Sequence, residues 1–161
     1  MKRLINLFAL LVATAVVVGT LMAQTKPPSF VGTWKLNLAK SKYEGTQAPK
    51  SLTRTVTAEG SGLMYSFEGE AADGSKISYS FTSKLDGSDS VVSGVGMPAG
   101  ADTVALQKTS VHKIPGVLKK GGAKIGTATA VISSDGQTVT VYSKVKVDGK
   151  EVKTEQVYEK Q

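Results

Sequence analysis

From Ser29 onwards, this 161-residue chain alternates apolar and polar side chains with a period of two. A period of two places one face of each segment in a core and the other in water, as in half-buried β-strands. No segment after residue 28 has the period of 3.6 that an amphipathic helix needs. The sequence therefore predicts an all-β fold. The apolar members of the clearest segments are Leu63, Tyr65 and Phe67, then Ile77, Tyr79, Phe81 and Leu85, and then Val139, Val141, Val145 and Val147.

Four Asp-Gly pairs, at 73–74, 86–87, 135–136 and 148–149, separate alternating segments. Both central residues of a type I′ turn need positive φ, which Asp tolerates and Gly adopts freely, so Asp-Gly is a strong hairpin signal. We therefore expect about nine strands, near residues 30–38, 51–59, 63–70, 76–85, 90–95, 102–112, 123–133, 138–147 and 151–159.

Strands joined by tight turns predict an antiparallel up-and-down meander. A meander of this length tends to close into a barrel, because closure removes edges that would pair with other chains. An open sandwich is the alternative. The absence of cysteine means that packing and strand pairing alone hold the domain together.

The first residues predict export. Lys2 and Arg3 precede an apolar run at positions 4–18, and Leu21-Met22-Ala23 offers a small residue for cleavage. A membrane anchor is the competing interpretation, but it usually needs about 20 apolar residues. We therefore divide the chain into a signal peptide at 1–23, a short linker at 24–28 and one β-barrel domain at 29–161, and expect a periplasmic or extracellular location.

Charge argues against a nucleic-acid partner. Removal of Lys2 and Arg3 with the signal lowers the formal net charge from +7 to +5, and Lys119-Lys120 is the only adjacent basic pair that remains. A nucleic-acid-binding surface would concentrate such charge on one face. We expect no cofactor, no metal site, no membrane anchor after cleavage of the signal, and a monomer.

Both ends of the domain carry a family resemblance. The segment FVGTWKLN at 30–37, with Gly32 and Trp34, resembles the first-strand motif of lipocalins and fatty-acid-binding proteins, and the closing QVYEKQ at 156–161 is similar to the last strand of the latter. The segments at 100–108 and 133–141 resemble exported bacterial lipocalin-like proteins of unassigned function. This resemblance implies a closed calycin barrel with a ligand inside.

Two departures from the fatty-acid-binding pattern bear on the ligand. Residues 39–50 are too short and too polar for the family's helix pair, so we expect no helical lid. The family's Arg-x-Tyr clamp for the ligand carboxylate is here Gln156-Val157-Tyr158. Gln lacks the positive charge, so the resemblance implies a neutral or hydroxyl-bearing ligand.

The inward faces supply the candidate site. Strict alternation places Arg54 on the same side as Trp34, and the resemblance implies that Arg54 stacks on Trp34 as a plug by a cation–π contact. A ligand role or surface exposure are the alternatives for Arg54. The candidate ligand-binding residues are Trp34, Tyr65, Phe67, Tyr79, Phe81, Lys108, Gln156 and Tyr158.

No catalytic centre is evident, so we expect no enzyme activity. His112 is the only histidine and has no identifiable catalytic partners. The glycine-rich segment 95–100 is not followed by a helix, so it lacks the features of a phosphate loop. Segment 114–122 is predicted to be a hairpin loop or a mobile flap. The leading hypothesis is an exported protein that binds an apolar or amphipathic ligand. The alternative is an interaction module with a side-chain-filled barrel.

Overall fold

The computed structural model describes residues 29–161, so the predicted signal peptide (1–23) and linker (24–28) lie outside the described residues. No helix in residues 29–161 is long and apolar enough to cross a membrane. The described chain forms two short 3₁₀ helices, η1 (Leu38–Lys40) and η2 (Pro98–Gly100), and the strands β1 (Gly32–Leu36), β2 (Lys42–Glu44), β3 (Ser51–Glu59), β4 (Gly62–Glu70), β5 (Lys76–Ser83), β6 (Asp86–Val91), β7 (Ser93–Val95), β8 (Thr103–Gln107), β9 (Lys113–Lys120), β10 (Ala123–Ile132), β11 (Thr138–Val147) and β12 (Lys150–Lys160).

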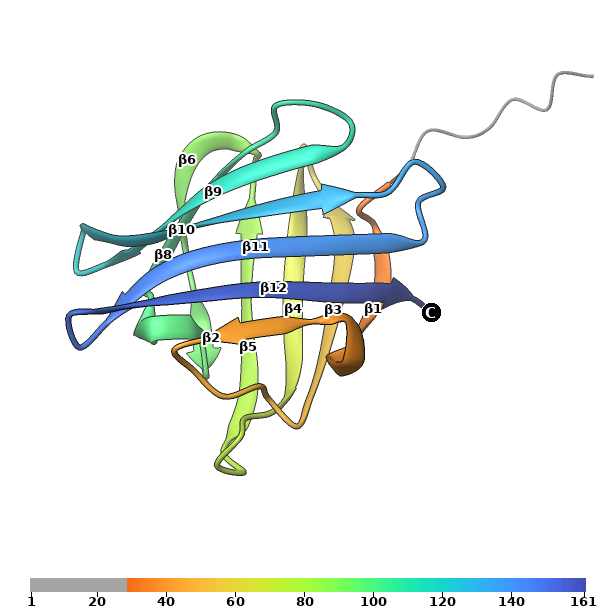
Figure 1. Cartoon of the computed structure of the whole chain (residues 1–161). Coiled ribbons are helices and arrows are strands. Elements are labelled where there is room, and N and C mark those ends of the chain that lie inside the picture. The colour runs from red at the N-terminus through yellow and green to blue at the C-terminus, as the bar shows by residue number, and fades with distance from the viewer. Residues whose placement is uncertain (1–28) are drawn as a thin grey trace, which may run out of the picture.

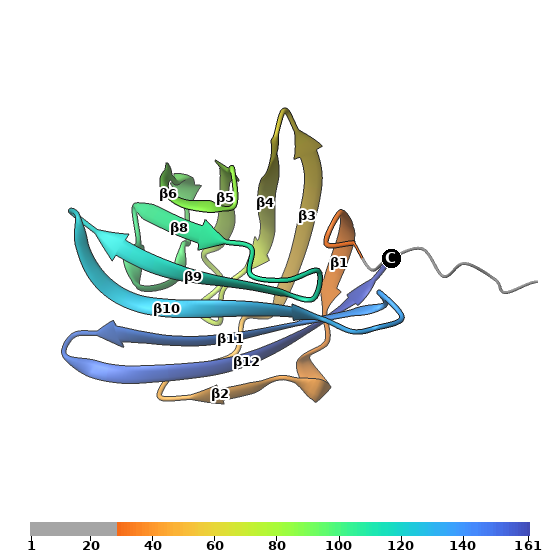
Figure 2. The same ribbon diagram turned by 90° about the horizontal axis from the view of Figure 1, so that it is seen from above.

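The strands form one antiparallel sheet that curls into a nearly closed barrel (Figure 1). Its order is β6-β8-β9-β10-β11-β12-β1-β3-β4-β5-β7, and β2 pairs with β12 beside β1. Strands β10 to β12 run across β3 to β5 at a steep angle, so the barrel consists of two layers with facing inner surfaces (Figure 2).

A single chain segment joins the two edges of the sheet. Strands β6 and β7 are separated only by Val92, yet they stand at opposite ends of the strand order. The segment pairs with β8 through β6 and with β5 through β7. This switch of partner nearly closes the barrel and leaves few unpaired edge groups.

One end of the barrel is filled with side chains. Trp34, Val56 and Val139 are fully buried there, and Phe30 and Ile132 are almost so. The Trp34 indole Nε1–H donates a hydrogen bond of 2.9 Å to the Phe30 carbonyl oxygen, which satisfies its only polar group. This packing closes the barrel at the end where the chain enters it.

The turns explain where the strand prediction holds and where it is wrong. Asp148 and Gly149 both have positive φ (49° and 77°), as a type I′ turn requires. Asp86 and Gly87, in contrast, lie inside β6, because the chain already reverses at Leu85, whose φ is +62°. The predicted turn is therefore displaced towards the N-terminus.

The sheet has twelve strands, rather than the roughly nine that the turn signals predicted. Segment 114–122 was predicted to be a loop or flap, but most of it belongs to strand β9, in which Ile114, Gly116 and Leu118 are buried in alternation. The expected strand at 102–112 ends at Gln107. Strand β2 was not expected, because its three residues are too short for a periodic signal.

Candidate ligand cavity

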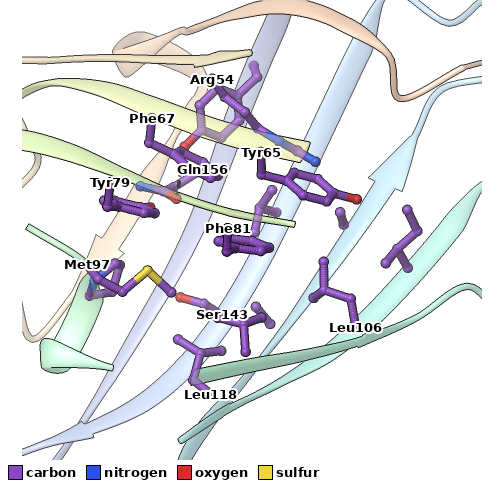
Figure 3. Close-up of a pocket in the computed structure, with 17 residues that line it drawn as sticks. Arg54, Tyr65, Phe67, Tyr79, Phe81, Met97, Leu106, Leu118, Ser143 and Gln156 are labelled. Atoms are coloured by element: carbon purple, nitrogen blue, oxygen red, sulfur yellow. Dashed lines mark hydrogen bonds between the residues drawn. The ribbon is translucent and has the colours of Figure 1, made fainter. Parts of the chain in front are cut away.

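Between the two layers lies a cavity of about 110 Å³. One water molecule needs roughly 10–15 Å³, so the cavity has room for an organic group. Inward-facing side chains of both layers line it, together with the loop that contains η2 (Figure 3). The lining residues are Arg54, Tyr65, Phe67, Tyr79, Phe81, Met97, Pro98, Val104, Leu106, Ile114, Leu118, Ala128, Ala130, Val141, Ser143, Gln156 and Tyr158.

A second hollow of about 220 Å³ adjoins this cavity at the barrel end opposite Trp34. It is bordered by the loop after β2, the turn after β4 and residues of η2. The two hollows share four lining residues, Tyr79, Pro98, Ser143 and Gln156. We refer to them as the inner cavity and the outer hollow, since the second one leads outwards from the first.

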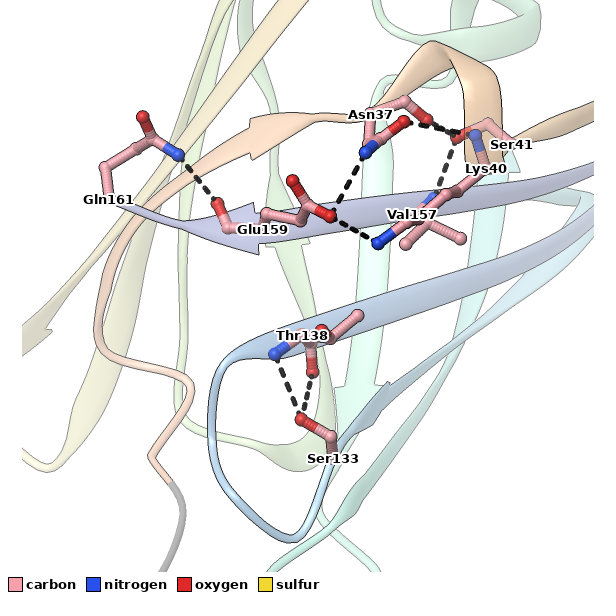
Figure 4. A network of polar contacts seen from close by, with 8 residues as sticks. All are labelled: Asn37, Lys40, Ser41, Ser133, Thr138, Val157, Glu159 and Gln161. Atoms are coloured by element: carbon pink, nitrogen blue, oxygen red, sulfur yellow. Dashed lines mark hydrogen bonds and ion pairs between the residues drawn. The ribbon is translucent and has the colours of Figure 1, made fainter.

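The segment after β1 explains why this end is open. In place of a helix pair, the chain forms only η1 and the short strand β2. Asn37 caps η1 by accepting the Lys40 N–H at 3.1 Å, and its side-chain amide donates to Glu159 at 3.1 Å. Ser41 Oγ donates to the Asn37 carbonyl oxygen and accepts the Val157 N–H (Figure 4). These bonds hold the segment along the edge of β12, with which β2 pairs, so no helix pair covers the barrel mouth.

Strands β4 and β5 form an aromatic wall along the inner cavity. Tyr65 lies opposite Phe81 and Phe67 opposite Tyr79 in the antiparallel register. The ring centroids of the first pair are 5.0 Å apart, and those of the second are 4.5 Å apart. Such stacked cross-strand pairs stabilise the sheet and present flat apolar surface to the interior.

Gln156 and Tyr158 on β12 belong to a chain of polar contacts. The Tyr158 hydroxyl donates to Gln156 Oε1 at 3.3 Å, and Gln156 Nε2 donates to the Tyr43 hydroxyl at 3.4 Å. Ser143 and Thr154 lie beside them and share a hydrogen bond of 2.7 Å. The polar groups on this side of the cavity are thus largely satisfied by one another.

Arg54 has no such partners. Only 3% of its surface is exposed, and its Nε and Nη1 atoms have no hydrogen-bond acceptor among residues 29–161. Its guanidinium lies over the Tyr65 ring, 5.2 Å from the centroid, rather than over Trp34. The expected stacking on Trp34 is therefore wrong, and Lys160 covers that ring instead, at 5.3 Å. Because the side chain of Arg54 turns towards Tyr65, it lines the inner cavity.

Burial sets the protonation of the phenols around the cavity. It raises the pKa of Tyr65, and it raises the pKa values of Tyr79 and Tyr158 far above the usual range for tyrosine. These hydroxyls therefore keep their protons at physiological pH and remain able to donate hydrogen bonds. Burial also lowers the pKa of Arg54, although a guanidinium keeps its proton throughout the physiological range.

The structure gathers most of the predicted site residues in one place and excludes two. Trp34 lies beneath the inner cavity in the filled end and does not line it. Lys108 is exposed and lies beyond the end of β8, so its predicted inward position is wrong. The residues that do line the inner cavity are Arg54, Tyr65, Phe67, Tyr79, Phe81, Gln156 and Tyr158.

Ten other lining residues were not among the predicted site residues, and four of them come from segments that the sequence predicted to be loops. Ile114 and Leu118 come from β9, whose alternation was present in the sequence but was interrupted by Pro115 and Gly116. Met97 and Pro98 come from the loop before β8, and no sequence pattern indicates that it turns inwards.

Among residues 29–161, the His112 ring contacts one hydrogen-bond partner, a backbone carbonyl oxygen. Its Nδ1 lies 3.3 Å from the Ile132 carbonyl oxygen. Within residues 29–161, no three His, Asp or Glu side chains are grouped so that they could hold a metal ion.

Comparison with known proteins identifies the fold. No protein-family model matches the sequence, and no curated protein matches it significantly. Among solved structures, zebrafish ileal bile acid-binding protein in complex with cholic acid aligns with a TM-score of 0.50 and 13% identity, over 82% of this chain and 98% of that chain. The siderocalin Ex-FABP, described as functioning through dual ligand specificities, aligns with a TM-score of 0.37 and 11% identity, over 81% and 73%. The match to the bile acid-binding protein and the nearly closed antiparallel barrel show that this chain has a lipocalin-like fold of the calycin type.

Proposed function

We propose that the protein binds a small apolar or amphipathic molecule inside its barrel. The observation that carries this proposal is the inner cavity, which is walled by stacked aromatic rings and adjoins the outer hollow. Ligand pockets usually measure about 300–1,000 Å³. Because the inner cavity alone is about 110 Å³, the expected ligand is slender and extends into the outer hollow.

Within this proposal the lining residues have distinct roles. Tyr65, Phe67, Tyr79 and Phe81 supply apolar contact area along one side of the ligand. Gln156 and Tyr158 orient it through hydrogen bonds, while Trp34 only supports the floor beneath. No lining group needs to carry out a chemical step. The zebrafish protein of the same fold is a binding protein, and this agrees with a non-catalytic role.

A neutral fluorescent probe and two matched variants test this proposal. N-phenyl-1-naphthylamine is expected to bind saturably to the purified protein. Ala130→Phe adds a ring inside the cavity and should weaken that binding by at least roughly tenfold. Thr129→Phe adds the same ring beside a hollow on the outer surface and should leave the binding of the probe unchanged. Absence of saturable binding would favour the filled-barrel interaction module instead.

We also propose that the protein acts outside the cytoplasm. The support is the basic start, the apolar run at positions 4–18 and the small residue Ala23. Protein isolated from the cells that produce it should then begin at Gln24. A chain that begins at Met1 and stays in the cytoplasmic fraction would contradict export.

A further inference from the structure

The guanidinium of Arg54 is a buried positive charge that has no counter-ion among residues 29–161. The side-chain ion pairs within residues 29–161 join lysines to surface carboxylates, and none of them includes Arg54. Two of its nitrogens have no hydrogen-bond acceptor in that part of the chain. A charge held in this way is costly unless it is paired and hydrogen-bonded, and arginine cannot lower the cost by losing its proton.

A second unpartnered donor lies beside it. The Tyr65 hydroxyl is also buried and has no hydrogen-bond partner among the described residues. Arg54 and Tyr65 come from the adjacent strands β3 and β4, and the Arg54 guanidinium lies over the Tyr65 ring. Both side chains line the inner cavity. The barrel thus presents several N–H donors and one O–H donor to the same small space.

The neighbouring groups cannot supply the missing negative charge. The Tyr158 hydroxyl donates to Gln156, and Gln156 in turn donates to Tyr43. Tyr79 and Tyr158 stay neutral because burial disfavours their phenolates. The cation–π contact with Tyr65 is a favourable interaction for Arg54, but it provides no hydrogen-bond acceptor for the Arg54 N–H groups.

We propose that Arg54 and Tyr65 bind the carboxylate of an amphipathic ligand. The planar fork of arginine donates two parallel hydrogen bonds to a carboxylate, and the tyrosine hydroxyl donates a third. This inference rests on the proposed function and names the ligand class for the same cavity. The expectation of a neutral ligand rested on Gln156, which carries no positive charge. Arg54 on β3 supplies a positive charge to the same cavity, so the expected ligand is anionic.

The position of Arg54 along β3 also orients the ligand. Leu52, two residues earlier on the same face, borders the outer hollow, whereas Val56, two residues later, is fully buried. Arg54 therefore lies at the inner end of the cavity. The carboxylate enters first, and the apolar body extends past Phe67 and Tyr79 towards the mouth.

Isothermal titration calorimetry with two ten-carbon ligands tests the assignment. At pH 7.5, delipidated protein should bind decanoate at least roughly tenfold more tightly than 1-decanol, which has the same chain without the charge. Arg54→Met should abolish this preference by weakening decanoate binding while decanol binding is kept. Tyr65→Phe should weaken decanoate binding by a smaller factor. Lys108→Met removes the same charge from an exposed site and should leave both affinities unchanged.

A second measurement uses the unaltered protein and does not depend on the folding of any variant. The carboxyl carbon of ¹³C-labelled decanoate, followed by NMR, should titrate at lower pH in the complex than in water, because the guanidinium favours the carboxylate. Equal binding of decanoate and decanol, or a raised carboxyl pKa in the complex, would overturn the assignment while the barrel remains a binding protein. If neither decanoate nor decanol binds, both the carboxylate assignment and the proposed function are wrong.

Discussion

At the scale of single residues, Arg54 is where the demands of stability and binding oppose each other. A buried charge that serves no structural partner lowers the stability of the ligand-free protein. Arg54→Met should therefore raise the free energy of unfolding of the ligand-free protein by about 1–2 kcal/mol. Removal of the unsatisfied polar groups outweighs loss of the cation–π contact. Urea unfolding of delipidated protein measures this. A clear destabilisation, with Lys108→Met neutral, would show that Arg54 is a structural plug.

The sequence was sufficient to place Arg54 on the inner face of the barrel, but not to predict which aromatic ring its side chain contacts. Alternation along β3 puts Arg54 on the inner face with Leu52 and Val56. The register sets it opposite both Trp34 and Phe67, and a long side chain on that face can also reach Tyr65. Only packing decides between these contacts. Lys108 was misplaced for a simpler reason, because β8 ends one residue before it.

At the scale of elements, the turn between β11 and β12 depends on positive φ angles at Asp148 and Gly149. Gly149 has a φ of +77°, and an added Cβ would meet nothing within 4 Å. Gly149→Ala should therefore lower the free energy of unfolding by about 1–2 kcal/mol, the cost of a left-handed conformation for a residue with a side chain. Thermal unfolding measures the change. Asp148→Gly, at a φ of +49°, should be close to neutral, and an equal loss in both variants would contradict this explanation.

Elements were predictable where a turn signal and a long alternating run occur together. Strands β3, β4, β10, β11 and β12 were expected close to their observed bounds for this reason. Strand β9 was missed because Pro115 and Gly116 are typical of loops, although the ladder with β10 accommodates both. The turn at Leu85 was misplaced because Asp86-Gly87 gives the stronger local signal, while pairing of β6 with β8 determines the actual strand.

At the scale of the whole molecule, the buried tyrosines predict an alkaline limit to stability. Burial raises the pKa values of Tyr65, Tyr79 and Tyr158 above that of the unfolded chain, near 10. A group whose pKa is raised on folding contributes stability that is complete below the unfolded pKa and is lost at higher pH. Urea midpoints should therefore fall above about pH 10. Phenolate absorbance should show that these three tyrosines ionise only on unfolding.

Hydrogen-bonded surface carboxylates predict that the protein loses stability at low pH. Hydrogen bonds from Ser75, Ser88 and Ser133 hold the pKa values of Asp73, Asp86 and Asp135 below their usual range. Such groups contribute stability above the unfolded pKa, and that stability is lost as the pH falls. The free energy of unfolding should thus decline below about pH 4. A midpoint that stays constant from pH 5 to pH 2 would contradict this origin.

The general architecture followed from the sequence, but the cavity did not. Alternation, turn signals and the two end motifs around Trp34 and Tyr158 were sufficient to predict an antiparallel barrel. A barrel of this size can be filled by its own side chains or can hold one ligand, and the choice depends on small differences in packing. Here the end around Trp34 is filled, whereas small residues such as Ala128, Ala130 and Ser143 leave space farther along.

Native mass spectrometry of protein isolated gently from the cells that produce it tests directly whether this barrel holds a ligand. We expect a reproducible extra mass that is released on denaturation, and we expect the released molecule to carry a carboxylate. A bare mass, unchanged after incubation with a lipid extract, would contradict ligand binding and would favour an interaction module.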